Sequence, residues 1–401
     1  MRRAVLAILA VIFGGIALAL LENARDLRSY RDLMLRSQEA QDRESHLKWG
    51  YIDETGHMVI APTFFDAGDF NGGIARVLRK GPNGLETGFI DRSGKYIIAP
   101  QPDKGYGEIS EGLIEFAGAR KVEHQINLPG NMAFGRRGPT LWGYIDKTGK
   151  VVIAPRLEEV TSFAEGLAAV KLDGKWGYID KTGKFAVAPR FADLAIGSFQ
   201  FSEGLAAVVV GGKRGYIDKT GRMVIPPQFA TAGSFHEGRA WVLASGFGYI
   251  DKKGRFTIPA TFRQAGDFSE GLAAVMDINR VIYIDKTGKP VFKQNFGSGA
   301  PFHDGLAPQT FRGSWGFIDR HGTMVIPARF GGPSEFHEGR AFVDIGGRFG
   351  LIDKTGKIVL PPAFEIARGF HEGLAAVQVW LDDPKENPPP QSVPATGSQS
   401  N

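Results

Sequence analysis

The sequence predicts an all-β protein assembled as a tandem array of nine short repeats. One string of residues recurs nine times along the chain, and short apolar, strand-like runs alternate with turn signals between its copies. Glycine accounts for 54 of the 401 residues, about twice its usual share, and without a collagen period this excess indicates many turns.

The recurring string is Gly-Tyr/Phe-Ile-Asp-x-x-Gly, with variation among the copies. Its aspartate stands at Asp53, Asp91, Asp146, Asp180, Asp218, Asp251, Asp285, Asp319 and Asp353. Successive aspartates are 38, 55, 34, 38, 33, 34, 34 and 34 residues apart, which sets the period at 34. We therefore expect nine units, each of them one supersecondary element.

Each unit is predicted to be a three-stranded antiparallel meander, as the copy beginning at Phe163 illustrates. Residues 167–172 form a first apolar run, and the dipeptide Asp173-Gly174 is typical of a two-residue hairpin turn. The second strand is expected at 175–180 and the third at 184–189. The proline that closes this third run, also present at Pro155, Pro227 and Pro362, is expected to end the strand because it lacks an N–H donor.

The turn after the second strand explains why its aspartate and glycine recur. The aspartate suits the first position of a type I turn, where its carboxylate accepts backbone N–H groups. The glycine suits a left-handed position that closes a hairpin with a bulge. Within the second strand, a glycine such as Gly177 indicates that a backbone or an aromatic ring packs closely against it.

No single meander can bury its apolar face, so neighbouring units must stack. Two arrangements fit the repeat: a curved solenoid or a propeller-like ring. Propeller blades usually contain four strands, so three strands per unit favour the open solenoid. We expect the terminal units to act as caps, because the first lacks an upstream strand and the last leads into a tail.

Four copies contain an intact Trp-Gly pair before the Tyr/Phe-Ile-Asp string, at Trp49, Trp142, Trp176 and Trp315. Other copies depart from it, with Thr87, Arg214, Phe247, Phe349 or the pair Val281-Ile282 at that place. Over residues 48–377 the pattern resembles the WG-repeat family. The resemblance implies a β-rich interaction array, as found in bacterial proteins of varied roles, and it transfers no catalytic residue.

The first 46 residues differ from the repeats. Arg2 and Arg3 precede an uncharged apolar run at 4–21, long enough in helical form to cross most of a bilayer. We expect residues 1–21 to be a signal anchor, with a cleaved signal peptide ending near Ala19 as the alternative. Residues 22–46 are expected to form a charged helical stalk. The basic start keeps the N-terminus cytoplasmic, so the array lies outside the cytoplasm: at the inner membrane and in the periplasm if anchored, or secreted if cleaved.

The rest of the chain divides into the array at 47–380 and a Pro- and Ser-rich tail at 381–401, expected to be disordered. There are no cysteines, which excludes disulfides and Cys-ligated zinc. The net charge of +5 is spread along the chain, whereas nucleic-acid binders concentrate basic residues, so we expect no nucleic-acid partner.

The nine aspartates are the most regular candidates for chemistry. An aspartic-protease interpretation fails because a further residue separates Asp from Thr-Gly and the site would be ninefold redundant. Calcium would need several oxygens per loop, and each turn offers one carboxylate. We assign the aspartates to turn capping and expect no metal, no cofactor and no catalytic residue.

Two further groups are candidates for a binding surface. His236, His303, His337 and His371 occupy one repeat position, and stacked imidazoles there could bind metal or change charge near pH 6. Serine or alanine stands there in other copies, which favours a solvated turn surface. A long insertion at 117–140 contains Arg120, Lys121, Arg136 and Arg137; a tolerated insertion is favoured over a contact loop.

These observations predict a non-catalytic envelope or exported protein whose array presents an extended surface to a protein or an envelope polymer, as a scaffold. Membrane contact is expected only through the N-terminal helix. The first rival is a hydrolase acting on envelope glycans, which would need two acidic residues facing one cleft about 5–10 Å apart. The second rival is a purely structural spacer.

Overall fold

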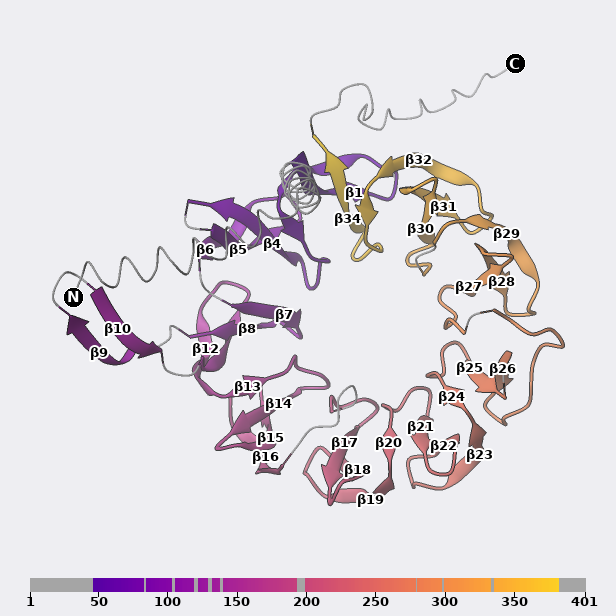
Figure 1. Ribbon diagram of the computed structural model, residues 1–401, viewed down its shortest axis with the longest axis horizontal. Helices are drawn as coiled ribbons and strands as arrows, with labels where there is room; N and C mark the ends of the chain where they lie inside the picture. Colours follow the sequence, from indigo (N-terminus) through magenta and orange to yellow (C-terminus); the bar gives the residue numbers. More distant parts are fainter. Residues whose placement is uncertain are drawn as a thin grey trace, which may run out of the picture.

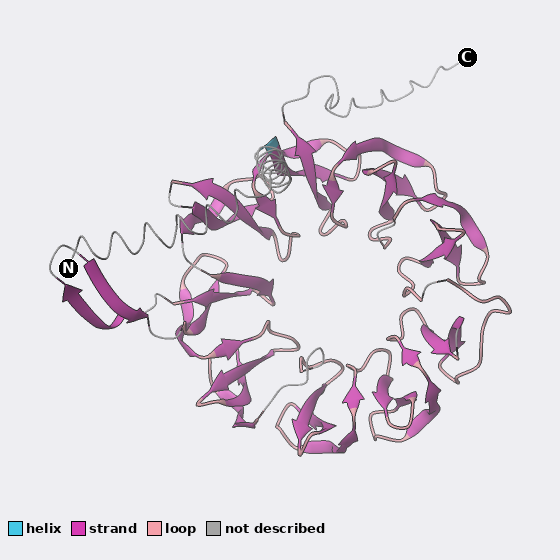
Figure 2. Cartoon of the chain, viewed as in Figure 1, coloured by secondary structure: helices cyan, strands magenta, loops and turns pink. Residues whose placement is uncertain are grey.

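A computed structural model describes residues 46–381, apart from 83, 103–104, 119–121, 129–131, 138–139, 193–198, 279, 298 and 333–334. All 34 named elements within these residues are β-strands (Figure 2). No helix in this described part of the chain is long and apolar enough to cross a membrane. The predicted anchor, stalk and tail, except for His46 and Leu381, lie outside the described residues.

Nine small antiparallel sheets, which we call blades 1 to 9, follow one another around a ring (Figure 1). Blade 1 contains β2 (Met58–Phe64), β1 (Leu47–Asp53), β34 (Leu374–Trp380) and β33 (Ile366–Ala367). Blade 2 contains β3 (Asp66–Ala67), β4 (Ile74–Gly81), β5 (Gly84–Asp91) and β6 (Tyr96–Pro102). Blade 3 contains β7 (Tyr106–Ser110), β8 (Leu113–Ala117), β11 (Trp142–Asp146) and β12 (Val151–Leu157).

The remaining blades continue in chain order. Blade 4 contains β13 (Glu159–Val160), β14 (Leu167–Leu172), β15 (Lys175–Asp180) and β16 (Phe185–Phe191). Blade 5 contains β17 (Leu205–Val210), β18 (Lys213–Asp218) and β19 (Met223–Phe229). Blade 6 contains β20 (Thr231–Ala232), β21 (Ala240–Leu243), β22 (Phe247–Ile250) and β23 (Phe256–Phe262). Blade 7 contains β24 (Gln264–Ala265), β25 (Leu272–Asp277) and β26 (Arg280–Asp285). Blade 8 contains β27 (Leu306–Phe311), β28 (Ser314–Asp319) and β29 (Met324–Phe330), and blade 9 contains β30 (Arg340–Ile345), β31 (Arg348–Asp353) and β32 (Ile358–Phe364).

The ring is closed by the two ends of the array. Strand β1 pairs antiparallel with β34 over seven residue pairs, from Leu47 opposite Trp380 to Asp53 opposite Leu374. The all-β repeat array is confirmed, and of the two arrangements the propeller-like ring is the one formed; the favoured open solenoid is wrong. The expectation of terminal caps is also wrong, because β34 supplies the upstream strand that the first unit lacks. Because the ring is closed, neither the first nor the last blade exposes the apolar face that packs against a neighbouring blade.

The three-stranded meander is confirmed, with one addition and one correction. Several blades gain a short extra strand, such as β13, which pairs with the following long strand through Val160 opposite Val170. The third strand does not end at its proline: β16 continues to Phe191, two residues past Pro189. Proline is tolerated because β16 is an edge strand and because Pro189 lies in a bulge.

The bulge also explains the glycine of each Trp-Gly pair. In blade 4, Trp176 pairs with Phe191 and Tyr178 with Val187, so the intervening stretch of β16 crowds Gly177. A Cβ atom at Gly177 would lie 2.5 Å from the Val187 carbonyl oxygen and 2.7 Å from the Pro189 nitrogen. The close backbone approach predicted at this glycine is therefore present.

Adjacent blades are joined by an aromatic contact that recurs around the ring. The Tyr178 ring meets Phe201 of the next blade edge-on, with centroids 5.0 Å apart, and its hydroxyl donates to the Phe199 carbonyl at 2.8 Å. Corresponding pairs are Tyr51–Phe70, Tyr144–Phe163, Tyr216–Phe235, Tyr249–Phe268, Tyr283–Phe302 and Phe317–Phe336. These buried rings place the core between blades as well as within them.

Blade 7, where Val281-Ile282 replaces the Trp-Gly pair, departs furthest from the repeat. After β26 there are only isolated bridges, Val281 with Phe296 and Ile284 with Pro290, in place of a third strand. Phe292 and Phe296 instead pack edge-on against Tyr283, with centroids 5.6 and 5.3 Å away. Aromatic packing thus replaces strand pairing here.

Replacing Gly177 with alanine is expected to lower the free energy of unfolding by about 1–3 kcal/mol, because the new Cβ meets backbone that must shift. Gly332→Ala is the matched control, since a Cβ there meets nothing within 4 Å. Urea unfolding followed by circular dichroism measures both variants. Equal midpoints for the two variants would contradict the close-approach explanation.

Candidate functional site on the inner rim

All nine repeat aspartates lie in the turns after the second strands, and each accepts two backbone N–H groups. Asp53 Oδ1, for example, accepts from Thr55 N at 2.9 Å and from His57 N at 3.0 Å. At Asp218 the Thr220 hydroxyl, followed by Arg222 and the backbone donors, outweighs burial and lowers the pKa of the carboxyl to about 2. The Asp218 carboxylate therefore stays ionised at neutral pH, and its hydrogen bonds are made within its own turn.

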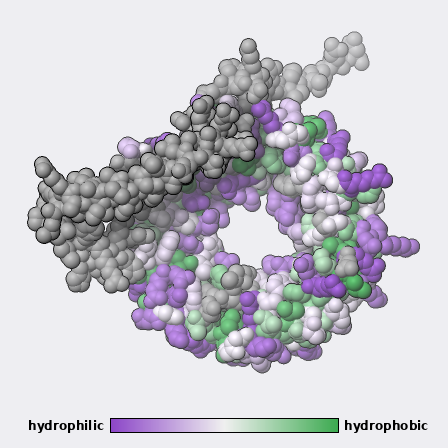
Figure 3. Space-filling model, viewed as in Figure 1, coloured by the Kyte–Doolittle hydropathy of each residue, from purple (hydrophilic) through white to green (hydrophobic). Residues whose placement is uncertain are grey.

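A second turn, Phe-x-Glu-Gly, leads into the first long strand of each blade. Glu165 and Gly166 both adopt left-handed conformations, with φ of 52° and 86°, which is typical of a two-residue type I′ hairpin. We call these turns the inner rim, because the end of β7 and the start of β34 both face the central opening of the ring (Figure 1). In the space-filling view, hydrophilic side chains border much of this opening (Figure 3).

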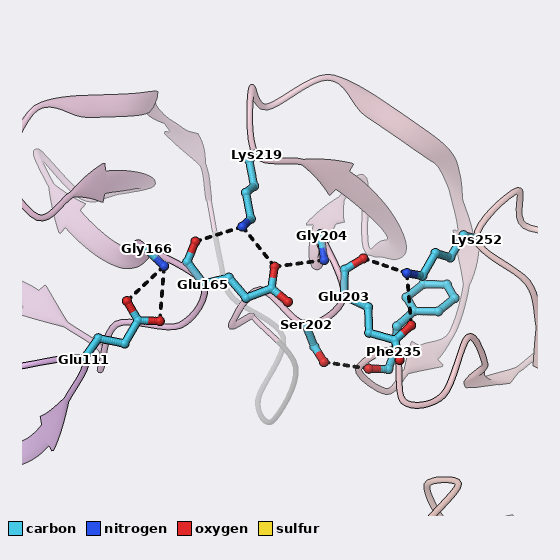
Figure 4. A network of polar contacts seen from close by, with 9 residues as sticks. All are labelled: Glu111, Glu165, Gly166, Ser202, Glu203, Gly204, Lys219, Phe235 and Lys252. Carbon is cyan, nitrogen blue, oxygen red and sulfur yellow. Dashed lines mark hydrogen bonds and ion pairs between the residues drawn. The ribbon is translucent and has the colours of Figure 1, made fainter. Parts of the chain in front are cut away.

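In eight of the nine inner-rim turns an acidic residue, the clasp residue, binds the next blade, and blade 2 has Gly72 at this position. Glu165 Oε2 accepts from Gly204 N at 2.9 Å and lies 3.1 Å from Lys219 Nζ (Figure 4). The same carboxylate-to-glycine bond is made by Glu111, Glu203, Glu237, Glu270, Asp304, Glu338 and Glu372. Sequence reasoning missed this role, although an acidic residue recurring before the same glycine was its signal.

The structure brings three of the four candidate histidines together. His337 lies between His303 and His371 on the inner rim, with ring centroids 5.5 Å apart on each side. Glu335 Oε2 lies 3.2 Å from His303 Nε2 and 3.7 Å from His337 Nε2. His236 is separate and pairs with Asp267 at 3.6 Å.

Not every blade has a histidine at this position of the inner-rim turn. In blades 5 and 7 a serine stands there, and the Ser202 and Ser269 hydroxyls each donate to the carbonyl of the next blade's phenylalanine at 2.6 Å. Within the described residues, no group of three His, Asp or Glu side chains has the geometry to hold a metal ion.

A cavity of about 230 Å³ opens next to His371, where the two ends of the array meet. Its charged and amide side chains are Asp69, Asn71, Arg76, Glu108, Arg368 and His371, drawn from blades 1, 2 and 3. We call it the seam cavity. Arg368 is held firmly, 3.1 Å from Asp66 and with its guanidinium 5.1 Å from the Trp49 ring centroid.

Copies of the repeat within the chain have neutral residues at the positions of two of these charges. The strand position of Arg76 is Ala169, Ala207, Ala274 or Ala376 in four other blades. Similarly, the position of Glu108, just before the inner-rim aromatic or apolar residue, is a serine at 162 and 234. Departures from the repeat therefore converge on one cavity, and comparing the copies position by position could have found them.

Glu115 of blade 3 is a further departure close to the seam cavity. It occupies the same strand position as Arg76, and its Oε1 accepts a hydrogen bond from the Ser162 hydroxyl at 2.9 Å. Burial raises the pKa of Glu115 to about 6; the serine bond opposes this change and the nearby Glu108 adds to it. Carboxyl groups with a raised pKa are typical of functional sites.

The described strands of the insertion lie away from the inner rim (Figure 1). The insertion includes the hairpin of β9 (Val122–Leu128) and β10 (Met132–Arg137), which projects from the outside of the ring (Figure 1). Arg136 and Arg137 end β10, whereas Arg120 and Lys121 lie outside the described residues. The insertion lies within one unit: it separates β8 from β11, which pair directly in blade 3.

Glu115→Gln is expected to raise the free energy of unfolding by about 1–2 kcal/mol at pH 7.5 relative to the native chain. Because the folded pKa of about 6 exceeds the usual 4.5, the native chain loses stability as pH rises through that interval. The gain should therefore shrink toward zero at pH 4. Urea unfolding at both pH values measures it, with the exposed Glu54→Gln as control; a gain independent of pH would contradict the assignment.

Solved structures with some likeness to the chain are distant. Porphyromonas gingivalis dipeptidyl peptidase 4 has a TM-score of 0.39 at 12% identity, covering 71% of this chain and 51% of that one. An uncharacterized protein of Listeria monocytogenes has a TM-score of 0.36 at 10% identity, covering 73% and 91%. Kluyveromyces lactis Hsv2p has a TM-score of 0.34 at 9% identity, covering 63% and 92%. Likenesses at this level carry no argument about function.

Comparison with curated proteins gives no match. The family model described as WG containing repeat matches residues 49–81, 88–119, 142–176, 176–213, 215–245, 247–279, 315–348 and 349–379. The matches leave out the stretch around Ile282, where blade 7 lacks its third strand. Together they cover more than half of the chain, and the chain therefore belongs to the WG-repeat family.

Proposed function

We propose that the ring is a non-catalytic binding module, a scaffold that holds a protein or an envelope polymer along its inner rim. The contact surface is the arc from His303 through His337 and His371 to the seam cavity. The observation that carries this proposal is the contrast between repeat positions. Turn aspartates, clasp residues and inter-blade aromatics are nearly uniform, whereas the exposed inner-rim positions differ from blade to blade.

This contrast favours a binding module over a structural spacer. A spacer needs the uniform positions, because they form the turns and join the blades. It does not need half-exposed imidazoles and carboxylates gathered on one arc, such as His337 and Glu335, whose side chains are 35% and 38% exposed. Varied polar groups on a rigid scaffold are typical of a recognition surface.

We also propose that the ring works outside the cytoplasm, anchored by residues 1–21 or released by their cleavage. The support is the apolar run at 4–21 behind Arg2 and Arg3. A C-terminal alkaline phosphatase fusion tests this placement, because that enzyme is active only after export. An inactive fusion would argue against it.

The binding surface can be located with a photo-crosslinking amino acid placed in the full-length, C-terminally tagged chain in its native cells. Substitution at His303 or His337 is expected to capture a partner with a yield at least tenfold above that at Lys213, an exposed position at the start of β18. Substitution at Arg136 tests the insertion in the same experiment. Crosslinks only from Arg136, or equal yields everywhere, would overturn the inner-rim assignment.

A hydrolase acting on envelope glycans remains the rival, and Glu115 is the observation that favours it. Its raised pKa and its neighbour Glu108 are the features expected of a carboxyl pair that works on a glycosidic bond. Release of soluble fragments from purified envelope glycan by the full chain, abolished by Glu115→Gln, would establish the rival. No release by the native chain would leave binding as the function, and equal release by Glu115→Gln would exclude Glu115 as the carboxyl responsible.

A further inference from the structure

We propose that the seam cavity binds a small zwitterion of the free α-amino acid class. This inference goes beyond the proposed function, although the cavity lies at one end of the same arc and shares His371 with it. It depends on three properties of the cavity: its size, the presence of both signs of charge, and the looseness with which some of these charges are paired.

The size of the cavity limits the ligand. Its volume of about 230 Å³ lies below the range of about 300–1,000 Å³ common for drug-sized ligands. Water takes up about 30 Å³ in the liquid, so the cavity has room for a molecule several times larger than water. A free amino acid fits this limit, whereas a folded partner or an oligosaccharide does not.

The charges around the cavity are of both signs. Arg76 and Arg368 are cationic, Asp69 and Glu108 are anionic, and Asn71 and His371 add polar groups. Arg368 and Asp69 already have partners, Asp66 at 3.1 Å and His371 at 3.6 Å, so a ligand with one charge would pair with only one of Arg76 and Glu108. A ligand with a carboxylate and an ammonium group close together satisfies both.

Two of these charges are held loosely. Arg76 Nη2 lies 3.8 Å from Glu108 Oε1, near the limit of an ion pair, and the Glu108 side chain is 75% exposed. By contrast, Arg368 is fixed by Asp66 and stacked over Trp49. A zwitterion can therefore insert between Arg76 and Glu108, its carboxylate toward the guanidinium and its ammonium group toward the carboxylates of Glu108 and Asp69.

The repeat provides substitutions compatible with the fold. Alanine stands in the place of Arg76 in four other blades, and serine in the place of Glu108 in two. Arg76→Ala and Glu108→Ser therefore introduce the residues that other blades of the same ring have at these positions. Lys213→Ala is the matched control, because it removes one exposed positive charge from β18, far along the chain in blade 5.

The test is saturation-transfer NMR on the full-length chain in detergent, with L-alanine, L-serine, L-glutamate, L-lysine and L-phenylalanine as separate probes. At least one is expected to bind saturably, and Arg76→Ala and Glu108→Ser should each weaken its affinity about tenfold or more, while Lys213→Ala leaves it unchanged. The N-acetyl and methyl ester forms of that probe, each lacking one charge, should also bind at least tenfold more weakly.

Several results would overturn the proposal: no probe binds the native chain, the cavity variants bind as well as the native chain, or acetate or methylammonium alone binds as well as the amino acid. Circular dichroism confirms that each variant is folded. If Arg76→Ala does not fold, Glu108→Ser decides the question alone. Because crosslinking on the inner rim uses different positions, failure of either proposal can be recognised without the other.

Discussion

Every blade of this ring depends on its neighbour for a core, and in seven of the nine blades the joining contact is an aromatic ring of the second strand set against a phenylalanine of the next blade. Tyr178 shows its two parts: a buried edge-on contact with Phe201 and a hydroxyl bond to a backbone carbonyl. Aromatic pairs of this geometry stabilise a core beyond their area burial. A blade by itself would expose these rings, so the array is stable only as a whole.

Ring closure follows from the same constraint. An open array would leave one face of its last blade and one face of its first without partners. Pairing of β1 with β34 removes both ends, and Glu372 completes the clasp by accepting from Gly72 N and Gly73 N at 2.5 and 2.9 Å. The blade formed from both ends is thus held by strand pairing and by a carboxylate bond to blade 2.

Closure also brings together the blades that differ most from the repeat in their charged residues. Eight turns carry an acidic clasp residue, whereas blade 2 has Gly72, and around this break lie Arg76, Glu108 and Arg368. The histidine arc ends at the same place. In a repeat protein the residues shared by all repeats maintain the fold, whereas residues that differ in one repeat are free to serve binding. Their convergence at one seam is the reason for assigning binding there.

Much of the local structure was determined by the sequence alone. The period of 34, the strand and turn order, the turn role of Asp53 and its equivalents, and the crowding at Gly177 all followed from short-range patterns, because turns and hairpins depend on neighbouring residues. The sequence also placed the histidines at one repeat position. It did not separate the three that stack from His236, because that depends on which blades are adjacent.

Only the tertiary structure decided how the array ends, what the recurring glutamate does, and where the departures meet. Closure depends on the small rotation between successive blades summed over nine units, and no single repeat contains that sum. The bond from Glu372 to Gly72 joins residues 300 positions apart. The seam cavity exists because Asp69, Arg76 and Arg368 come together only when the two ends of the array complete one ring.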